Sequence, residues 1–143
     1  MAVMVYEEPG TVISNPDYKS NGNTVKLLRI VLTKAESKFD FGYQTSDYYI
    51  RGGWITISPK TFIRETGGTI KFTLQKSTNI PFGPQKHYFN STIDWSYFSL
   101  HFPPLAKEIA KIDLIEAEPG TKNDFNFFNI KLKDPAKSDL ILI

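Results

Sequence analysis

Two histidines are the residues of this chain best suited to chemistry, because imidazole exchanges a proton near neutral pH. In an acyl hydrolase, His87 or His101 could act as the base, Asp94 as the carboxylate that orients it, and Ser96 as the nucleophile. However, no G-x-S-x-G elbow surrounds a serine, and Ser96 stands between aromatic residues of a predicted strand. We therefore expect no catalytic residues and no enzyme. The hydrolase alternative depends on a hydroxyl and a carboxylate within hydrogen-bond reach of either imidazole.

A second group of polar residues surrounds the predicted turn at 119–120. Glu116, Glu118, Asn123 and Asp124 carry oxygens of the kind that calcium prefers, but their spacing does not match an EF-hand loop. The chain has no cysteine, and its two histidines form no recognisable zinc-ligand pair. Acidic residues at a turn are usually solvated, so we expect no metal site.

Phosphate and nucleic-acid sites are not predicted either. The pairs Gly52-Gly53 and Gly67-Gly68 lack the following Lys-Ser/Thr of a phosphate-binding loop. Seventeen basic and fifteen acidic residues leave a net charge of only +2, which is too small to attract nucleic acid strongly. We expect no cofactor and no nucleic-acid partner.

Aromatic residues are the strongest functional signal, at 14% of the chain. Exposed Tyr and Trp anchor protein interfaces and can also stack on sugar rings, whereas the structural alternative is that other segments cover them. Aromatic residues in a polar connection, or opposite an apolar stripe, are the candidates for an exposed surface. The predicted interaction surface consists of Tyr48, Tyr49, Trp54, Trp95 and Tyr97.

Period-two alternation predicts the strands that must position these residues. Phe39, Phe41 and Tyr43 alternate with polar residues, and 95–102 places Phe98, Leu100 and Phe102 opposite Trp95, Tyr97 and His101. On that strand we expect His101 at the rim of the outer face. The run 24–33 changes parity at Leu27-Leu28, which indicates a bulge or a strand buried on both faces. In the last strand, 125–133, we expect Phe128, Ile130 and Leu132 on one side, and Ile70, Phe72 and Leu74 form another apolar stripe.

These elements predict an all-β protein. The fold class is a two-sheet antiparallel β-sandwich, immunoglobulin-like, with seven to nine strands. We also expect one short helical turn at 105–111, in which Leu105 and Ile109 would close one end of the sandwich. A closed barrel is the alternative. We divide the single unit into an N-terminal strand and loop (1–23), the β-sandwich domain (24–133) and a C-terminal tail or added strand (134–143).

One set of segments in the middle and C-terminal parts of the chain occurs in a characteristic order, namely 54–63, 79–81, 86–89, 98–107, 112–116 and 125–130. Its most specific part is Pro103-Pro104-Leu105-Ala106-Lys107 followed by 112–116. This order resembles a poorly characterised β-sandwich module of Bacteroidetes proteins, which occurs beside thioredoxin-like, peptidase or helical-repeat domains. The resemblance covers about 24–132, and Ala106 stands where a second-turn proline is expected. The resemblance implies fold and lineage, and it carries no catalytic residues to this chain.

Together these observations predict a non-catalytic protein-interaction or structural module of a larger, envelope-associated bacterial assembly. The alternative is a carbohydrate-binding module that uses exposed Trp and Tyr. We expect a protein partner or neighbouring domain, with glycan as the alternative ligand, and no membrane span, because the apolar runs stay far below the roughly 20 residues that cross a bilayer. No signal peptide is visible; a trimmed signal would favour the periplasm or cell envelope, and otherwise the protein is expected in the cytoplasm.

Overall fold

The computed structural model describes residues 6, 10–20, 25–44, 54–55, 57–78, 87–88, 95–118 and 125–132. At 43–44, 54–55, 87–88 and 95–96 it describes the backbone alone. In this part of the chain every regular element is a β-strand.

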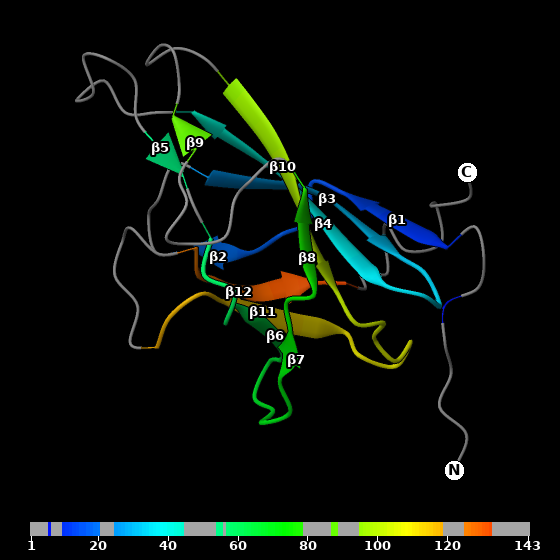
Figure 1. Cartoon of the computed structure of the whole chain (residues 1–143). Helices are drawn as coiled ribbons and strands as arrows, with labels where there is room; N and C mark the ends of the chain where they lie inside the picture. Colours follow the sequence, from blue (N-terminus) through cyan, green and yellow to red (C-terminus); the bar gives the residue numbers. More distant parts are fainter. Residues whose placement is uncertain are drawn as a thin grey trace.

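Two five-stranded antiparallel sheets form the layers of the molecule (Figure 1). The first sheet has the order β1 (Thr11–Ser14), β3 (Val25–Leu32), β4 (Ser37–Gln44), β10 (Trp95–Phe102) and β8 (Lys76–Thr78). The second has the order β2 (Lys19–Ser20), β12 (Phe127–Lys131), β11 (Lys111–Ile115), β6 (Phe62–Glu65) and β7 (Phe72–Thr73). A separate pair joins β5 (Trp54–Ile55) to β9 (His87–Tyr88). The predicted two-sheet antiparallel β-sandwich is therefore confirmed.

The strand count differs from the predicted one only in its shortest members. Twelve strands are described, of which eight have three residues or more, within the predicted seven to nine. The other four, β2, β5, β7 and β9, have two residues each, and of these β7 lies in the predicted apolar stripe of Ile70, Phe72 and Leu74. The N-terminal segment supplies β1 at the edge of the first sheet and β2 at the edge of the second, so it is built into both layers.

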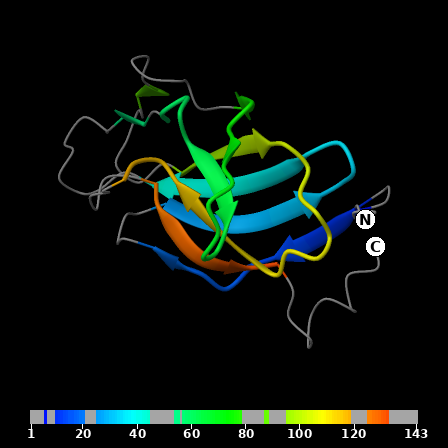
Figure 2. The same cartoon turned by 90° about the horizontal axis from the view of Figure 1, so that it is seen from below.

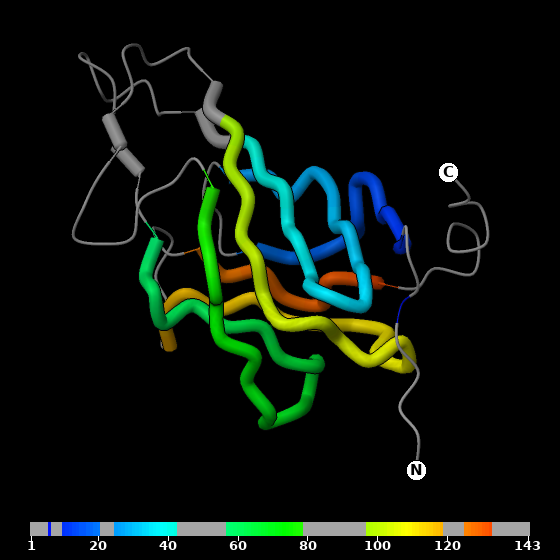
Figure 3. The backbone as a smooth tube through the Cα atoms, turned by 45° about the vertical axis from the view of Figure 1, so that its right-hand side comes forward, coloured from blue at the N-terminus to red at the C-terminus, as the bar shows by residue number. Residues whose placement is uncertain are grey.

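The connection from β7 to β8 is one of those that join the two layers. Seen from below, the second sheet lies in front of the first (Figure 2). The green chain of β7 and β8 passes from one layer to the other (Figure 3). Leu74, between these strands, is buried, and its N–H donates to the Thr61 carbonyl at 2.8 Å. Thr78 is thereby placed on an edge strand beside β10.

The parity change in β3 is a bulge, as one of the two sequence interpretations required. Leu27 pairs with Phe41 and Arg29 with Asp40, so Leu28 is the extra residue on β3. The Leu28 carbonyl accepts the Asn15 N–H at 2.8 Å, and Asn15 has a left-handed φ of 50°. The bulge lets Val25 and Leu27 on one side of it, and Ile30 and Leu32 on the other, all face the core.

A second bulge lies in β12 and overturns one predicted side-chain orientation. Ile112 pairs with Ile130 but Leu114 pairs with Phe127, so β12 has one extra residue in this stretch. Asn129 takes a left-handed φ of 53° there. Phe127 and Ile130 are fully buried, whereas Phe128 is only half-buried, so the prediction that Phe128 shares a face with Ile130 is wrong.

Phenylalanine side chains join the layers in the core. The Phe41 ring of the first sheet lies 5.1 Å from the Phe98 ring beside it and 5.5 Å from the Phe127 ring of the second sheet. Phe39 packs edge-on against Phe102 at 5.4 Å. Such ring pairs add about 0.5–1.5 kcal/mol each beyond the area that they bury. Most of the aromatic side chains that the structure describes thus lie in the core.

Two further predictions need correction. The segment expected to form a helical turn contains only a hydrogen-bonded turn, in which the Ile109 N–H donates to the Ala106 carbonyl at 3.2 Å, and no helix. Leu105 is nevertheless buried and Ile109 packs against the core, so both side chains contribute to the core without a helix. Ile70 is 72% exposed rather than part of an apolar stripe, because β7 begins only at Phe72.

Candidate functional site

The outer face of the first sheet is the candidate site. Phe98, Leu100 and Phe102 are buried, as predicted, and Tyr97 on the opposite side of the strand is 61% exposed. We call this surface the Tyr97 face. It consists of the outward positions of β3, β4, β8 and β10, namely Lys26, Arg29, Val31, Lys38, Asp40, Gly42, Lys76, Thr78, Tyr97, Ser99 and His101.

Strand register places these residues in three rows across the sheet. Lys26, Gly42 and Tyr97 form the first row, and because glycine has no side chain, the Tyr97 ring has no side-chain neighbour at the paired β4 position. Arg29, Asp40, Ser99 and Thr78 form the second row. Val31, Lys38, His101 and Lys76 belong to the third. The exposed phenol therefore stands at one end of a polar, cation-rich surface.

Asp40 is the centre of the second row. Its Oδ2 accepts a hydrogen bond from Arg29 Nε at 2.8 Å, and its Oδ1 accepts one from Ser99 Oγ at 2.6 Å and lies 3.4 Å from Lys38 Nζ. Burial favours the neutral acid, but the hydrogen bonds from Ser99 and Arg29 and the positive charges of Lys38 and Arg29 outweigh it and lower the pKa of Asp40 below 3.8. The carboxylate is thus ionised at neutral pH and largely compensated.

His101 is held between a carboxylate and a hydroxyl. Its Nδ1 lies 2.9 Å from Glu36 Oε1 and its Nε2 lies 2.9 Å from Thr78 Oγ1. Only 8% of the residue is exposed, so its predicted place at a rim is wrong: Glu36, in the turn before β4, and Thr78, on the edge strand, cover it from two sides. The hydrogen-bond cluster on which the hydrolase alternative depends is therefore present at His101.

The turn that carries Glu36 is itself well ordered by local hydrogen bonds. Thr33 Oγ1 accepts the N–H groups of Ala35 at 3.1 Å and Glu36 at 3.2 Å, and the Thr33 N–H donates to the Glu36 carbonyl at 3.0 Å. Sequence reasoning missed Glu36 and Thr78, which stand 65 and 23 residues from His101. No local motif could have revealed them, because strand pairing alone brings them to the imidazole.

The other predicted site residues are described only in part. Tyr48 and Tyr49 lie outside the described residues. Trp54 is in β5 and Trp95 in β10, with the backbone described but not the side chain. The side chains of the predicted triad, His87, Asp94 and Ser96, are likewise outside the described part. Tyr97 is thus the member of the predicted surface whose exposure the structure describes.

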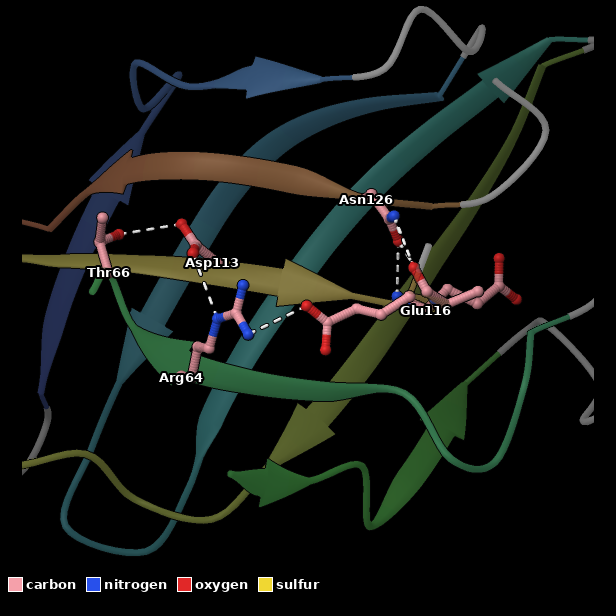
Figure 4. A network of polar contacts seen from close by, with 7 residues as sticks. Arg64, Thr66, Asp113, Glu116 and Asn126 are labelled. Carbon is pink, nitrogen blue, oxygen red and sulfur yellow. Dashed lines mark hydrogen bonds and ion pairs between the residues drawn. The ribbon is translucent and has the colours of Figure 1, made fainter. Parts of the chain in front are cut away.

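A second polar network lies on the second sheet (Figure 4). Asp113, which is 6% exposed, accepts hydrogen bonds from Arg64 Nε at 3.3 Å, Thr66 Oγ1 at 2.9 Å and the Asn129 N–H at 3.0 Å. The last of these bonds satisfies the backbone at the β12 bulge. Arg64 also reaches Glu118 Oε2 at 3.1 Å. This network links β11 to β12 and to β6 and the residue that follows it.

The acidic residues before the predicted turn at 119–120 contribute to the same sheet. Glu116 Oε2 accepts the Ser58 N–H and its Oε1 accepts the Phe125 N–H, both at 2.9 Å. Asn126 Oδ1 accepts the Glu116 N–H at 2.8 Å, and its Nδ2 donates to the Ala117 carbonyl at 2.8 Å. Asn123 and Asp124 lie outside the described residues, among which no cluster of three metal-ligating side chains occurs. Glu116 and Glu118 thus have partners within the protein.

Comparison with protein-family models, with curated proteins and with solved structures found no match. Within the described residues, no helix has the length and apolar character needed to cross a bilayer. The class of protein that the fold defines is a two-sheet antiparallel β-sandwich, and its function has to be argued from the Tyr97 face.

Proposed function

We propose that the protein is a binding module that docks a protein partner on the Tyr97 face. The single observation that carries this proposal is the 61% exposure of Tyr97 on a mostly polar sheet surface. A tyrosine buries a large area while losing few rotatable bonds, and an anchor on a paired strand needs little ordering on binding. Docking of this kind requires no chemical step, so the proposed role is non-catalytic.

The charges around Tyr97 favour an acidic partner surface. Lys26, Arg29, Lys38 and Lys76 are the cations of the face, and the Asp40 carboxylate is already bonded to Arg29, Lys38 and Ser99. Lys26 and Lys76 are exposed. A partner that presents carboxylates around an apolar recess for the phenol would complement both features.

The sequence resemblance extends this proposal to a setting. A module of the Bacteroidetes type would dock against a neighbouring domain or a subunit of a larger, envelope-associated assembly. This lineage and location remain predictions from the residues of 24–132.

A photocrosslinking amino acid at position 97, installed in the organism that expresses the chain, would test the proposal. Ile70, the other exposed large apolar residue, provides a matched position on the second-sheet side. We expect a crosslinked partner from position 97 but not from position 70. With the purified partner, Tyr97→Thr should weaken binding about 30-fold, as expected for loss of an aromatic anchor, and Ile70→Thr should leave it unchanged. Equal binding by Tyr97→Thr and the unmodified protein would contradict the proposal.

A carbohydrate ligand is the second candidate, favoured by the polar groups beside the exposed ring. Ser99 lies on the same face of β10 as Tyr97, and Asp40, on the neighbouring strand β4, pairs with Ser99. Sugars combine a face that stacks on aromatic rings with hydroxyls that such groups can bind. A shift of intrinsic fluorescence on adding glycans, absent in Tyr97→Thr, would favour this candidate over the protein partner.

A further inference from the structure

The Thr78–His101–Glu36 relay contains the groups of an activated nucleophile. A hydroxyl, an imidazole and a carboxylate are joined by two hydrogen bonds of 2.9 Å each. We propose that Thr78 is an acyl acceptor, whose hydroxyl takes an acyl group from an ester or thioester of a small carboxylic acid with His101 as the base. This inference goes beyond the docking role and does not depend on it.

The carboxylate determines which imidazole nitrogen is the base. An ionised Glu36 can only accept a hydrogen bond, so Nδ1 of His101 carries the proton in this contact. In the neutral ring Nε2 is then unprotonated and accepts the hydrogen bond from the Thr78 hydroxyl. This tautomer directs the lone pair of the base at the proton that must be removed.

The exposure of the three side chains fits an acceptor that meets its donor from solvent. Thr78 is exposed on the edge strand β8, whereas the His101 side chain is only 10% exposed and the Glu36 side chain 40%. The base is shielded while the nucleophile is reachable. Lys38 and Lys76 occupy the positions paired with His101 on either side, so positive charge is available near the oxyanion that an attacked carbonyl forms.

The transfer step balances without a further reagent. Thr78 Oγ1 attacks the carbonyl carbon of the donor while its proton passes to Nε2 of His101. The bond from that carbon to the ester oxygen or the thioester sulfur then breaks. The alcohol or thiol leaves with the electron pair and takes the proton from Nε2. The product is an ester of Thr78, and the Glu36 carboxylate stabilises the imidazolium formed between these two proton transfers.

Ser99 provides an internal control for this chemistry. It pairs with Thr78 across the β8–β10 ladder and also donates a short hydrogen bond, but to Asp40 Oδ1 at 2.6 Å. The lowered pKa of Asp40 makes that carboxylate a weak base. Two neighbouring hydroxyls therefore differ in their base, and only Thr78 should react.

The test uses p-nitrophenyl acetate at neutral pH, with the release of nitrophenolate and the mass of acid-quenched peptides as readouts. We expect one acetyl group on the peptide that contains Thr78, and a fast phase of release that is absent in Thr78→Val. His101→Gln should slow this phase about 100-fold, the usual contribution of a general base. Thr73→Val, which changes an exposed threonine of β7 outside the Tyr97 face, should leave it unchanged.

Each variant needs a check of its fold, since His101 is buried. If His101→Gln unfolds, as judged by circular dichroism, Glu36→Gln serves in its place, because it retains the hydrogen-bonding shape and removes the charge that stabilises the imidazolium. A fast phase that persists at the unmodified rate in Thr78→Val, or an acetyl group confined to lysines, would overturn the proposal and leave the relay as a tie between β8, β10 and the turn before β4.

Discussion

The two sheets use their carboxylates differently. In the second sheet, Asp113 and Glu116 accept backbone N–H groups, those of Asn129, Ser58 and Phe125. In the first sheet, Asp40 and Glu36 are bonded by side chains, those of Arg29, Ser99, Lys38 and His101. A carboxylate that holds backbone determines the path of the chain, whereas one held by side chains can change partners when a ligand approaches.

The difference in exposure follows the same division. Asp113 and Asn126 are 6% and 3% exposed, and removing a buried hydrogen-bonding group leaves its partners unsatisfied. The Arg29 side chain, in contrast, is 51% exposed and Tyr97 is 61% exposed. We therefore assign the second-sheet network to stability and the Tyr97 face to binding, and the following predictions can break that assignment.

Asp113→Ala should have the largest effect on stability. It removes the carboxylate that accepts hydrogen bonds from the Arg64 guanidinium, the Thr66 hydroxyl and the Asn129 N–H. We expect the free energy of unfolding to fall by about 3 kcal/mol, measured by urea denaturation. Asp113→Asn, which keeps one acceptor oxygen, should lose less. A loss below about 0.5 kcal/mol, typical of a plain surface substitution, would contradict the structural role.

Glu116→Gln should have the next largest effect. One of the two backbone N–H groups bonded to the carboxylate, from Ser58 or Phe125, would then face an amide NH₂ group. We expect a loss of about 2 kcal/mol in the same measurement. Glu118→Gln is the matched control, because Glu118 is 46% exposed and contacts Arg64 at the surface. Its change should stay within about 0.5 kcal/mol, and equal losses in the two variants would refute the distinction.

Asp40→Asn should have a smaller effect, and one that depends on pH. The pKa of Asp40 is lowered in the folded protein, so its stabilising contribution is complete well above 3.8 and is lost as the pH falls through the folded-state value. At neutral pH we expect the variant to lose about 1 kcal/mol or less. The difference in unfolding free energy between the two proteins should shrink as the pH drops below 3.8. A difference that grows on acidification would show that the pKa shift has the opposite sign.

Tyr97→Thr should have the smallest effect on stability, although it removes the proposed anchor. Threonine keeps the preference for β-structure, and most of the Tyr97 surface is already in solvent. The free energy of unfolding, followed through the thermal midpoint, should differ from that of the unmodified protein by no more than about 0.5 kcal/mol. A large destabilisation would mean that the ring is needed to cover Gly42 and would remove the reason for treating it as a binding residue.

Much of the first sheet was predictable because its pattern is local. Alternation alone placed Phe39 and Phe41 in the core, and it separated Phe98 and Leu100 from Tyr97 on opposite faces of β10. The bulge in β3 could also be read from the parity change at Leu27-Leu28. Phe128 was misplaced because a left-handed residue, Asn129, shifts the register of β12, and Asn does not by itself specify that conformation.

Tyr97 is the residue of the candidate site whose placement the sequence predicted correctly. Tyr97 could be assigned to an outer face, whereas His101 was assigned to a rim although Glu36 and Thr78 cover it. Both partners are far from it in the chain, and neither belongs to a motif with fixed spacing. Likewise, nothing in the sequence around Asp113 indicates that it would hold the N–H of Asn129.

The order of side chains along the chain by itself determined most of the longer strands and the two-layer class, because a sheet with one apolar face must bury that face against another layer and the sequence predicts no long helix to provide it. Only the tertiary structure decided which strands pair and in which register, and hence which polar groups meet. That information is absent from local patterns, since hydrogen bonds between strands depend on contacts across tens of residues. The relay at His101 and the network at Asp113 both arise at that level.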